Sequence, residues 1–128
     1  MQRKNISSGA PWEDIVGYSR AVKIGNIIEV SGTAPIQDGK VHGETAYEQA
    51  IACLEIIKQS LEEAGATMED VVRTRIFVTD ISQWKEFAKA HAKYFGQIKQ
   101  ATSMIEISRL IDRKMLVEIE ATAVISNQ

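Results

Sequence analysis

Alternating apolar and polar positions predict that the first half of the chain contains two short strands. The segment "GYSRAVKIGNIIEVSG" has this pattern over about 18–23 and 27–31. Gly25 and Asn26 lie between the two runs and are typical of a tight turn. The following "APIQDGKVHGE" is punctuated by proline and glycine, which indicates a loop.

Two later stretches instead repeat apolar residues every three or four positions, the spacing of a helix with one buried side. The first spans about 45–64, where Thr45 and Glu48 have the spacing of a capping box. The second spans 83–95, and Ser82 immediately before it is the predicted N-cap. Both stretches are followed by glycine, a common residue after the end of a helix.

Three more segments have the composition and alternation of strands, namely 70–80, 102–110 and 116–125. The predicted order is therefore β-β-α-β-α-β-β. Two helices and about five strands predict an α+β domain in which both helices pack on one face of a single sheet. With 128 residues and no internal repeat or linker, the chain is expected to form one domain over 1–128.

Parity along these strands predicts which side chains face the helices and which face away from them. The helix-facing side is expected to carry the apolar positions, which are Ile28, Val30, Ile76, Val78, Ile105, Ile107, Val117, Ile119 and Ala121. The open face is then expected to carry Tyr18, Arg20, Glu29, Ser31, Arg73, Arg75, Phe77, Thr102, Met104, Glu106, Glu118 and Glu120. A bulge within a strand would reverse its assignment, because it shifts the register by one residue.

The composition and net charge of the chain limit the kinds of partner and the cellular location that we expect. A formal charge of −2 and a pI near 5.7 do not favour binding to nucleic acid or to an anionic membrane. No apolar run approaches the ~20 residues that span a bilayer. The single cysteine, Cys53, fits a reducing compartment, and the start of the chain lacks the apolar core of a signal peptide. We therefore expect a cytoplasmic protein.

The sequence contains few of the familiar catalytic motifs. Neither GxGxxG nor GxxxxGK[ST] occurs, so no phosphate-binding loop of a known type is predicted. Two distant histidines and one cysteine make a poor metal site, and no metal or other cofactor is expected. His91 lies on the apolar side of its helix and Cys53 lies among apolar neighbours, so both are interpreted as packed residues rather than ligands.

The open face carries the residues with possible chemistry. Glu118 and Glu120 lie two positions apart on one strand, about 7 Å from each other at about 3.3 Å per residue. A carboxylate beside another one has a raised pKa when it is partly desolvated, which suits a general acid/base near neutral pH. Two interpretations remain open: a solvated face with structural Arg–Glu pairs, or a subunit interface with polar pockets.

Four segments, "GYSRAV", "SGTAP", "EEAGATMEDVVRTRIFVTD" and "RL…VEIEATAV", occur in an order and spacing that resemble the RidA (YjgF-type) family. The resemblance runs from about 18 to 124. It implies a chorismate-mutase-like α+β fold with two helices on one face of a mixed sheet. It also implies a homotrimer, with the sheets turned inward and small-molecule clefts between subunits.

Many members of this family hydrolyse enamines and imines to 2-keto acids and ammonia without a cofactor. Carried over to this chain, the resemblance implies that Glu118 directs water and that Tyr18 and Ser31 line the cleft. Thr102 stands where the family has an arginine that grips the substrate carboxylate, and Met104 stands where a cysteine is frequent. A threonine hydroxyl supplies neither charge nor a bidentate fork, so turnover of 2-iminobutanoate-type substrates is not expected.

Two functions therefore compete. The first is a cofactor-free hydrolase of the imine or enamine deaminase type, and the second is a metabolite-binding or regulatory trimer without turnover. Arg20 and Arg75 are the candidates to replace the missing cation. The alternative for both arginines is pairing with Glu29, Glu106 or Glu120 in a purely structural role. RNA cleavage, suggested by older names in the family, is disfavoured by the acidic composition.

Overall fold

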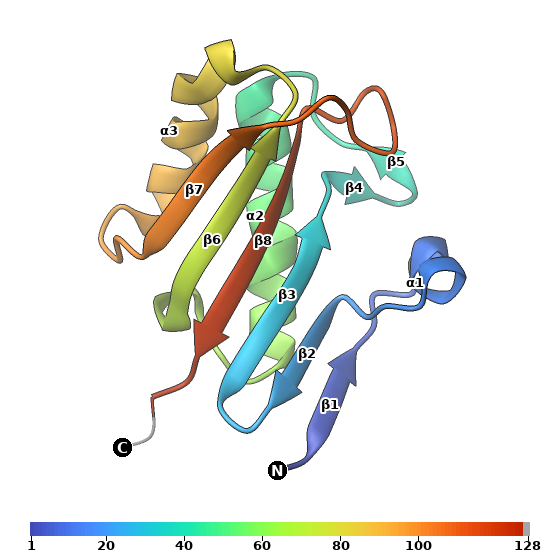
Figure 1. The fold of residues 1–128 in the computed structure, drawn as a ribbon, viewed down its shortest axis with the longest axis vertical. Helices are drawn as coiled ribbons and strands as arrows, with labels where there is room; N and C mark the ends of the chain where they lie inside the picture. The colour runs from blue at the N-terminus through green and yellow to red at the C-terminus, as the bar shows by residue number, and fades with distance from the viewer. Residues whose placement is uncertain (127–128) are drawn as a thin grey trace.

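The computed structural model describes residues 1–126 and contains one six-stranded mixed sheet (Figure 1). The spatial order is β1-β2-β3-β8-β6-β7, and only β6 and β7 are parallel neighbours. The strands are β1 (Arg3–Ile6), β2 (Ala21–Ile24), β3 (Ile27–Thr33), β6 (Val71–Val78), β7 (Ala101–Glu106) and β8 (Val117–Val124). Two short strands, β4 (Ile36–Gln37) and β5 (Lys40–Val41), form a separate hairpin.

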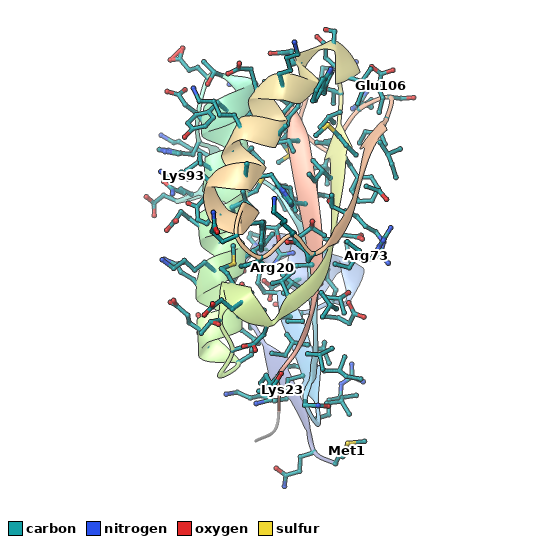
Figure 2. The ribbon with its side chains drawn as sticks, turned by 90° about the vertical axis from the view of Figure 1, so that its left-hand side faces the viewer. Met1, Arg20, Lys23, Arg73, Lys93 and Glu106 are labelled. Atoms are coloured by element: carbon teal, nitrogen blue, oxygen red, sulfur yellow. The ribbon has the colours of Figure 1, made fainter. Side chains whose placement is uncertain are left out.

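The two long helices, α2 (Ala46–Glu63) and α3 (Trp84–Phe95), lie on the same face of this sheet (Figures 1 and 2). Within residues 1–126, the opposite face carries no helix of this length. Short 3-10 turns, η1 (Met68–Asp70) and η2 (Ile81–Gln83), precede β6 and α3. The predicted α+β class, and the placement of both helices on one face of the sheet, are confirmed.

The start of α2 follows directly from its sequence. The Thr45 hydroxyl accepts a hydrogen bond from the Glu48 amide at 3.1 Å, and the Glu48 carboxylate accepts from the Thr45 amide at 3.2 Å. This reciprocal pair is the predicted capping box. The predicted N-cap role of Ser82 is wrong, because Ser82 lies inside η2. The Asp80 carboxylate caps that turn instead, accepting from the Ser82 amide at 3.0 Å.

The core lies between the helices and the sheet. Seven of the predicted helix-facing residues are buried, with exposed fractions of 3% or less, namely Ile28, Val30, Ile76, Val78, Val117, Ile119 and Ala121. Side chains from α2 and α3 complete the core, including Leu54, Ile57, Leu61, Phe87 and Phe95. Cys53 is fully buried among them, as predicted. Period-two alternation therefore identified the buried side of β3, β6 and β8.

The face assignment of β7 is wrong by one residue. Thr102 and Met104 pair with Thr74 and Ile76 of β6, both of which face the helices. Paired residues of neighbouring strands point to the same face, so Thr102 and Met104 do as well. Ile105 consequently points to the open face, where it is 45% exposed. Ile107, also predicted to face the helices, lies beyond the end of β7 and is half-buried.

The reason for this error is the position of β7 at the edge of the sheet. Its burial is incomplete on both faces, so apolar and polar residues do not separate cleanly between odd and even positions. Strands with one covered and one solvated face give a clear alternation, whereas β7 is partly exposed on both faces.

The N-terminal segment forms two elements that the sequence pattern did not predict. Residues 3–6 form the edge strand β1, and the short helix α1 (Pro11–Val16) follows. Pro11 occupies the first turn of α1, a position that tolerates its missing N–H, and Gly17 ends the helix in the left-handed region at φ +90°. Figure 1 shows α1 beyond the end of β1, on the side of the β4–β5 hairpin.

Within residues 1–126, none of the helices combines the length and apolar character that crossing a bilayer requires.

Candidate functional site

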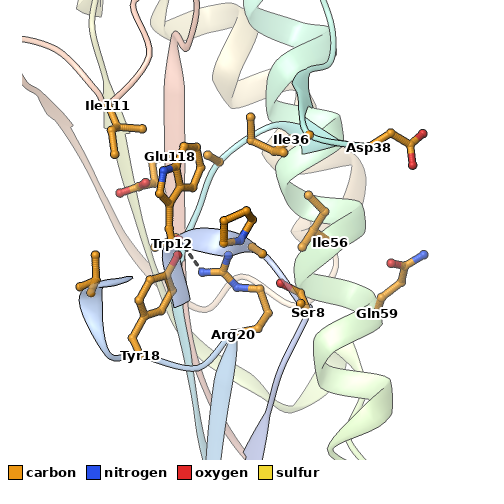
Figure 3. A pocket seen from close by; sticks show the side chains of 17 residues that line it. Ser8, Trp12, Tyr18, Arg20, Ile36, Asp38, Ile56, Gln59, Ile111 and Glu118 are labelled. Atoms are coloured by element: carbon orange, nitrogen blue, oxygen red, sulfur yellow. Dashed lines mark hydrogen bonds between the residues drawn. The ribbon is translucent and has the colours of Figure 1, made fainter. Parts of the chain in front are cut away.

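A cavity of about 550 Å³ lies where α1, the start of β2, the end of β3 and α2 meet (Figure 3). Its polar side is formed by Tyr18, Arg20 and Glu118, three of the residues singled out from the sequence. Apolar residues from four segments form most of the remaining wall, namely Trp12, Ile36, Ile56 and Ile111. The cavity therefore places the Arg20 cation and the partly buried Glu118 carboxylate beside a largely apolar wall.

Arg20 does not lie on the open sheet face, as parity predicted. It precedes β2, is only 9% exposed, and turns its guanidinium into the cavity. Its Nη2 donates a hydrogen bond to the Gly32 carbonyl at 2.5 Å, and the guanidinium lies 5.8 Å from the centre of the Tyr18 ring. Its Nε is buried without a hydrogen-bond partner among residues 1–126. A buried donor of this kind is costly unless a ligand or water meets it.

Glu118 projects from β8 into the same cavity, beside Gly32 of β3. Burial raises the pKa of the Glu118 carboxyl, the positive charge of Arg20 opposes the rise, and Glu120 adds to it; the net shift is upward. A Cβ atom on Gly32 would lie 2.7 Å from Glu118 Oε1, so only glycine leaves the carboxylate in its place. Arg20 and Glu118 make no direct ion pair within the described part of the chain, and both remain available to a ligand.

The other two cleft residues implied by the resemblance differ in position. Tyr18 lines the cavity, and Figure 3 shows its hydroxyl pointing toward the space beside Trp12 and Arg20. Ser31 lies outside the cavity lining, and its hydroxyl donates to the Ser19 carbonyl at 2.7 Å. That bond holds the segment before β2 against β3, so Ser31 supports the position of Arg20 from outside the cavity.

Thr102 and Met104 also lie outside this cavity, on the helix side of β7. Thr102 Oγ1 accepts a hydrogen bond from Thr74 Oγ1 at 2.8 Å, and Thr74 is in turn 2.8 Å from His91 Nε2. Burial lowers the pKa of His91, which favours the neutral imidazole. This agrees with the interpretation of His91 as a packed residue. Met104 packs against the core.

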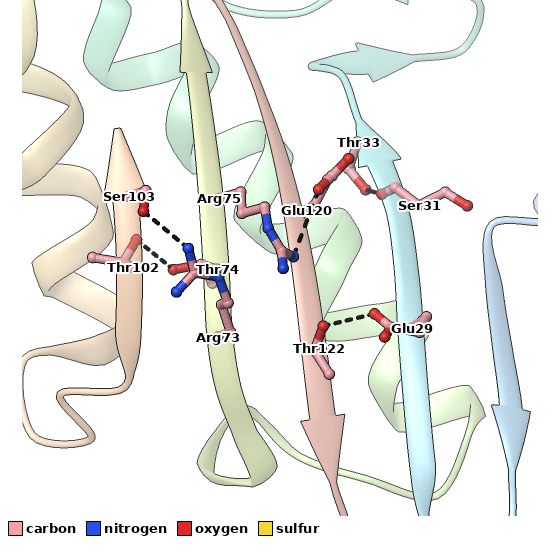
Figure 4. Close-up of polar contacts among 10 residues, drawn as sticks. All are labelled: Glu29, Ser31, Thr33, Arg73, Thr74, Arg75, Thr102, Ser103, Glu120 and Thr122. Carbon is pink, nitrogen blue, oxygen red and sulfur yellow. Dashed lines mark hydrogen bonds and ion pairs between the residues drawn. The ribbon is translucent and has the colours of Figure 1, made fainter. Parts of the chain in front are cut away.

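Arg75 lies outside the cavity lining and makes one of the Arg–Glu pairs considered as its alternative. It pairs with Glu120 at 3.8 Å on the open sheet face, with both side chains about 40% exposed (Figure 4). On the same face, Arg73 donates to the Ser103 hydroxyl at 3.0 Å, and the Thr122 hydroxyl donates to Glu29 at 2.6 Å. Arg20 pairs with none of the carboxylates considered for it, within residues 1–126.

Sequence reasoning missed the wall of the cavity formed by α1 and α2. A signal for α1 was available, because Pro11 followed by Glu13 and Asp14 is typical of the first turn of a helix. No pattern in the sequence brings Trp12 to Ile56, since these residues are far apart along the chain. Among residues 1–126, no three of His, Cys, Asp or Glu are grouped so that they could hold a metal ion.

Comparisons with known proteins agree with this architecture. Residues 9–125 match the family described as Endoribonuclease L-PSP. A RutC family protein of Pyrococcus abyssi is 38% identical over 108 residues, covering 83% of this chain and 84% of that protein. The structure of Rv2704 of Mycobacterium tuberculosis, a member of the YjgF/YER057c/UK114 family, superposes with a TM-score of 0.91. It is 47% identical, over 97% of this chain and 100% of that one.

The YjgF gene product of E. coli has the same architecture, with a TM-score of 0.83 and 31% identity over 94% of this chain and 98% of that one. These structures share the chorismate-mutase-like fold, so the fold implied by the sequence resemblance is confirmed. The family match covers nearly the whole described chain, including every element that forms the cavity. The chain belongs to the endoribonuclease L-PSP family, the family of YjgF, RidA and RutC.

Proposed function

We propose that the cavity binds a small anionic metabolite and that Glu118 moves a proton during hydrolysis of its carbon–nitrogen double bond. The observation that carries this proposal is that a desolvated carboxylate and a buried, incompletely bonded guanidinium line the same cavity. A general acid/base works best when its pKa lies near the operating pH, and burial moves Glu118 in that direction. The reaction class is that of an imine or enamine deaminase.

The chemistry needs only water. The Glu118 carboxylate takes a proton from water as the water oxygen bonds to the imine carbon, and it returns that proton to the nitrogen. It then takes the proton of the new hydroxyl and passes it to the amino nitrogen as the carbon–nitrogen bond breaks, so that the carbonyl forms, ammonia leaves and Glu118 is again a carboxylate. One imine molecule and one water molecule give one keto compound and one ammonia. No atom is oxidised or reduced, so the reaction needs no redox cofactor.

Arg20 supplies the positive charge for the anionic group of the ligand. A guanidinium has five N–H donors, and the Gly32 carbonyl takes one of them. Charge-assisted hydrogen bonds to a carboxylate contribute roughly 1.5–3 kcal/mol each. In this arrangement Arg20 replaces the arginine that is absent at position 102.

The proposal includes a homotrimer, with the open sheet faces turned toward each other. That face combines the half-buried Phe77 with Ile27 and Ile105, which are 49% and 45% exposed, and with the Arg75–Glu120 pair. Arginine and phenylalanine are enriched in interfaces. Sedimentation equilibrium is expected to give three times the chain mass at micromolar concentration, and a monomer under these conditions contradicts this part.

A second candidate, ligand binding without turnover, is favoured by one observation. Thr102 faces the helices and bonds to Thr74, so β7 contributes no charged group to the cavity. The substrate would then be held at Arg20 alone, without the bidentate arginine that orients it elsewhere in the family. RNA cleavage, the activity in the family's name, fits poorly with a chain of net charge −2.

The test is a competition assay for imines. An L-amino-acid oxidase, with catalase present, releases 2-imino acids from a panel of amino acids, and semicarbazide traps any imine that has not been hydrolysed. The wild-type protein is expected to lower the semicarbazone yield for at least one substrate, and Glu118→Gln is expected to leave the yield unchanged. Trapping is needed because spontaneous hydrolysis gives the same products.

Calorimetric titration with the corresponding 2-keto acids separates the two candidate functions. Binding together with faster imine loss supports the hydrolase. Binding that depends on Arg20, without any acceleration, contradicts the hydrolase and supports the binding module. If neither binding nor acceleration occurs with folded protein, the cavity is not the functional site.

A further inference from the structure

The cavity is larger than a three- or four-carbon acid requires. Its volume of about 550 Å³ falls within the roughly 300–1,000 Å³ of pockets that enclose ligands of drug size. The charged and hydrogen-bonding groups suited to an acid are concentrated at Tyr18, Arg20 and Glu118. A small 2-keto or 2-imino acid would contact these groups and leave the rest of the cavity to water.

The remaining wall is apolar where it is sheltered and polar only where it is exposed. Trp12, Ile36 and Ile56 are half-buried, and their side chains surround the space beside Arg20 (Figure 3). The other polar lining residues, Ser8, Asp38 and Gln59, are all exposed. A sheltered apolar surface favours an apolar ligand group, because burial of such surface removes it from water.

Trp12 is held in this wall by hydrogen bonds at both ends of α1. The Glu13 carboxylate is 5% exposed and accepts from the Ser7 hydroxyl at 2.8 Å and from the Ser8 amide at 3.1 Å. At the other end, the Tyr18 amide donates to the Glu13 carbonyl at 2.9 Å. The backbone of α1, which carries Trp12, is therefore held in place before any ligand arrives, and this lowers the entropy cost of binding.

We infer that the substrate class of this site is a 2-keto or 2-imino acid with a bulky apolar side chain, aromatic or branched, and that Trp12 is the residue that selects it. The carboxylate lies at Arg20, the reacting carbon lies beside Glu118, and the side chain packs on the indole, Ile36 and Ile56. This inference rests on the proposed function for the placement of the carboxylate. Trp12 selects the side chain, and Glu13, through its bonds to Ser7 and Ser8, acts as a positioning residue.

The experiment compares three probes by calorimetry on the full chain. Phenylpyruvate carries the carboxylate and the bulky group, pyruvate carries only the carboxylate, and phenylacetone carries only the bulky ketone. Wild-type protein is expected to bind phenylpyruvate at least about tenfold more tightly than pyruvate, since each added methylene in an apolar pocket favours binding by about tenfold or more. Trp12→Ala is expected to remove most of this preference and to change pyruvate binding less than about twofold.

Trp84→Ala is the matched control, because Trp84 lies on α3, is 50% exposed, and does not line the cavity. It is expected to keep the wild-type preference. Equal affinity for phenylpyruvate and pyruvate, or equal weakening of both by Trp12→Ala, overturns the inference and leaves the proposed function in place. If phenylacetone binds as tightly as phenylpyruvate, and its binding depends on Trp12 but not on Arg20, the apolar selection is retained and the anion site is overturned. Failure of all three probes to bind overturns both.

Discussion

Glu118 and Glu120 lie two residues apart on β8 and project to the same side of the sheet, yet they lie in different regions of the molecule. Glu118 lies in the cavity, where burial raises its pKa and the nearby Arg20 is not bonded to it. Glu120 lies on the open sheet face, about 40% exposed, and pairs with Arg75 at 3.8 Å. Each of these glutamates thus has an arginine nearby, unbonded to it in the cavity and paired with it on the open face.

The difference comes from what covers each residue. The N-terminal segment with α1 and the loop after β3 enclose Glu118, whereas no element of residues 1–126 covers Glu120. An exposed ion pair contributes only about 0–1 kcal/mol, since water screens it. A desolvated carboxylate that lacks a direct partner is costly for stability and is suited to proton transfer. The two glutamates are therefore expected to differ in function because neighbouring segments cover Glu118 and leave Glu120 exposed, although the residue type is the same.

The largest expected difference between the two regions is in turnover. Glu118→Gln is expected to slow imine hydrolysis by about 10²–10⁴-fold, the usual contribution of a positioned acid/base. Glu120→Gln removes the same charge two residues away and is expected to change the rate by less than about threefold, since the screened pair contributes little. Initial rates in the semicarbazide assay measure both. Similar losses in the two variants would show that the regions do not differ in function.

A methyl group at position 32 is expected to have the next largest effect. Gly32→Ala places a Cβ 2.7 Å from Glu118 Oε1, so the carboxylate must move while its charge and the rest of the cavity are retained. A displacement of about 1 Å costs on the order of 10²-fold in rate. The measurement is the rate of imine hydrolysis beside circular dichroism, which should show a folded protein. An unchanged rate would mean that the carboxylate position is not critical.

Ligand affinity should distinguish the two arginines. Arg20→Gln is expected to weaken 2-keto acid binding by about 10–100-fold, because a charge-assisted contact contributes roughly 1.5–3 kcal/mol. Arg75→Gln should change affinity less than about twofold, since Arg75 bonds to Glu120 outside the cavity. Calorimetry gives both affinities.

Arg20→Lys keeps the positive charge but lacks the guanidinium that bonds to the Gly32 carbonyl. It therefore separates the effect of the charge on ligand affinity from the effect of losing that bond. Binding that survives in Arg20→Lys, but not in Arg20→Gln, attributes the effect to charge. Equal binding in Arg20→Gln and the wild type would remove Arg20 from the site.

The smallest expected effect is on stability and depends on pH. The folded-state pKa of Glu118 is raised, so its charged form destabilises the protein. This destabilisation is absent below the ordinary glutamate pKa, grows as the pH rises through the folded-state pKa, and is constant above it. Glu118→Gln should therefore melt above the wild type at pH 8, by less than about 4 °C for a screened, half-exposed group. The difference should disappear near pH 4.

Melting curves of Glu120→Gln serve as the control for this effect. No such gain is expected there, since the Glu120 carboxylate is paired with Arg75 in solvent. A gain for Glu118→Gln that is equally large at pH 4 would show that titration of the carboxyl is not its cause.

Much of the fold was predictable because its elements have strong local signals. Thr45 and Glu48 predicted the capping box of α2, and the alternation of β8 predicted its buried side correctly at Val117 and Ile119. The site was predictable only in part. Glu118 and Tyr18 were identified through the family motifs, whereas Trp12 was missed, because its segment carries no apolar periodicity.

The predictions were wrong for residues whose orientation depends on pairing or contact with neighbouring segments. Thr102 was assigned to the open face, although its pairing with Thr74 turns it toward the helices. Arg20 was assigned to a strand face, although it lies before β2 and reaches the Gly32 carbonyl. A shift by one residue reverses the face of a strand residue, and edge strands carry the weakest pattern.

The order and type of the main elements, and the family to which the chain belongs, were determined by the sequence itself, because periodicity, caps and motifs are properties of neighbouring residues. The tertiary structure alone decided that Arg20 rather than Arg75 shares a cavity with Glu118, and that Trp12 closes this cavity. These outcomes depend on contacts between segments that are distant along the chain. The burial that shifts a pKa or frees a guanidinium exists only after those segments have packed together.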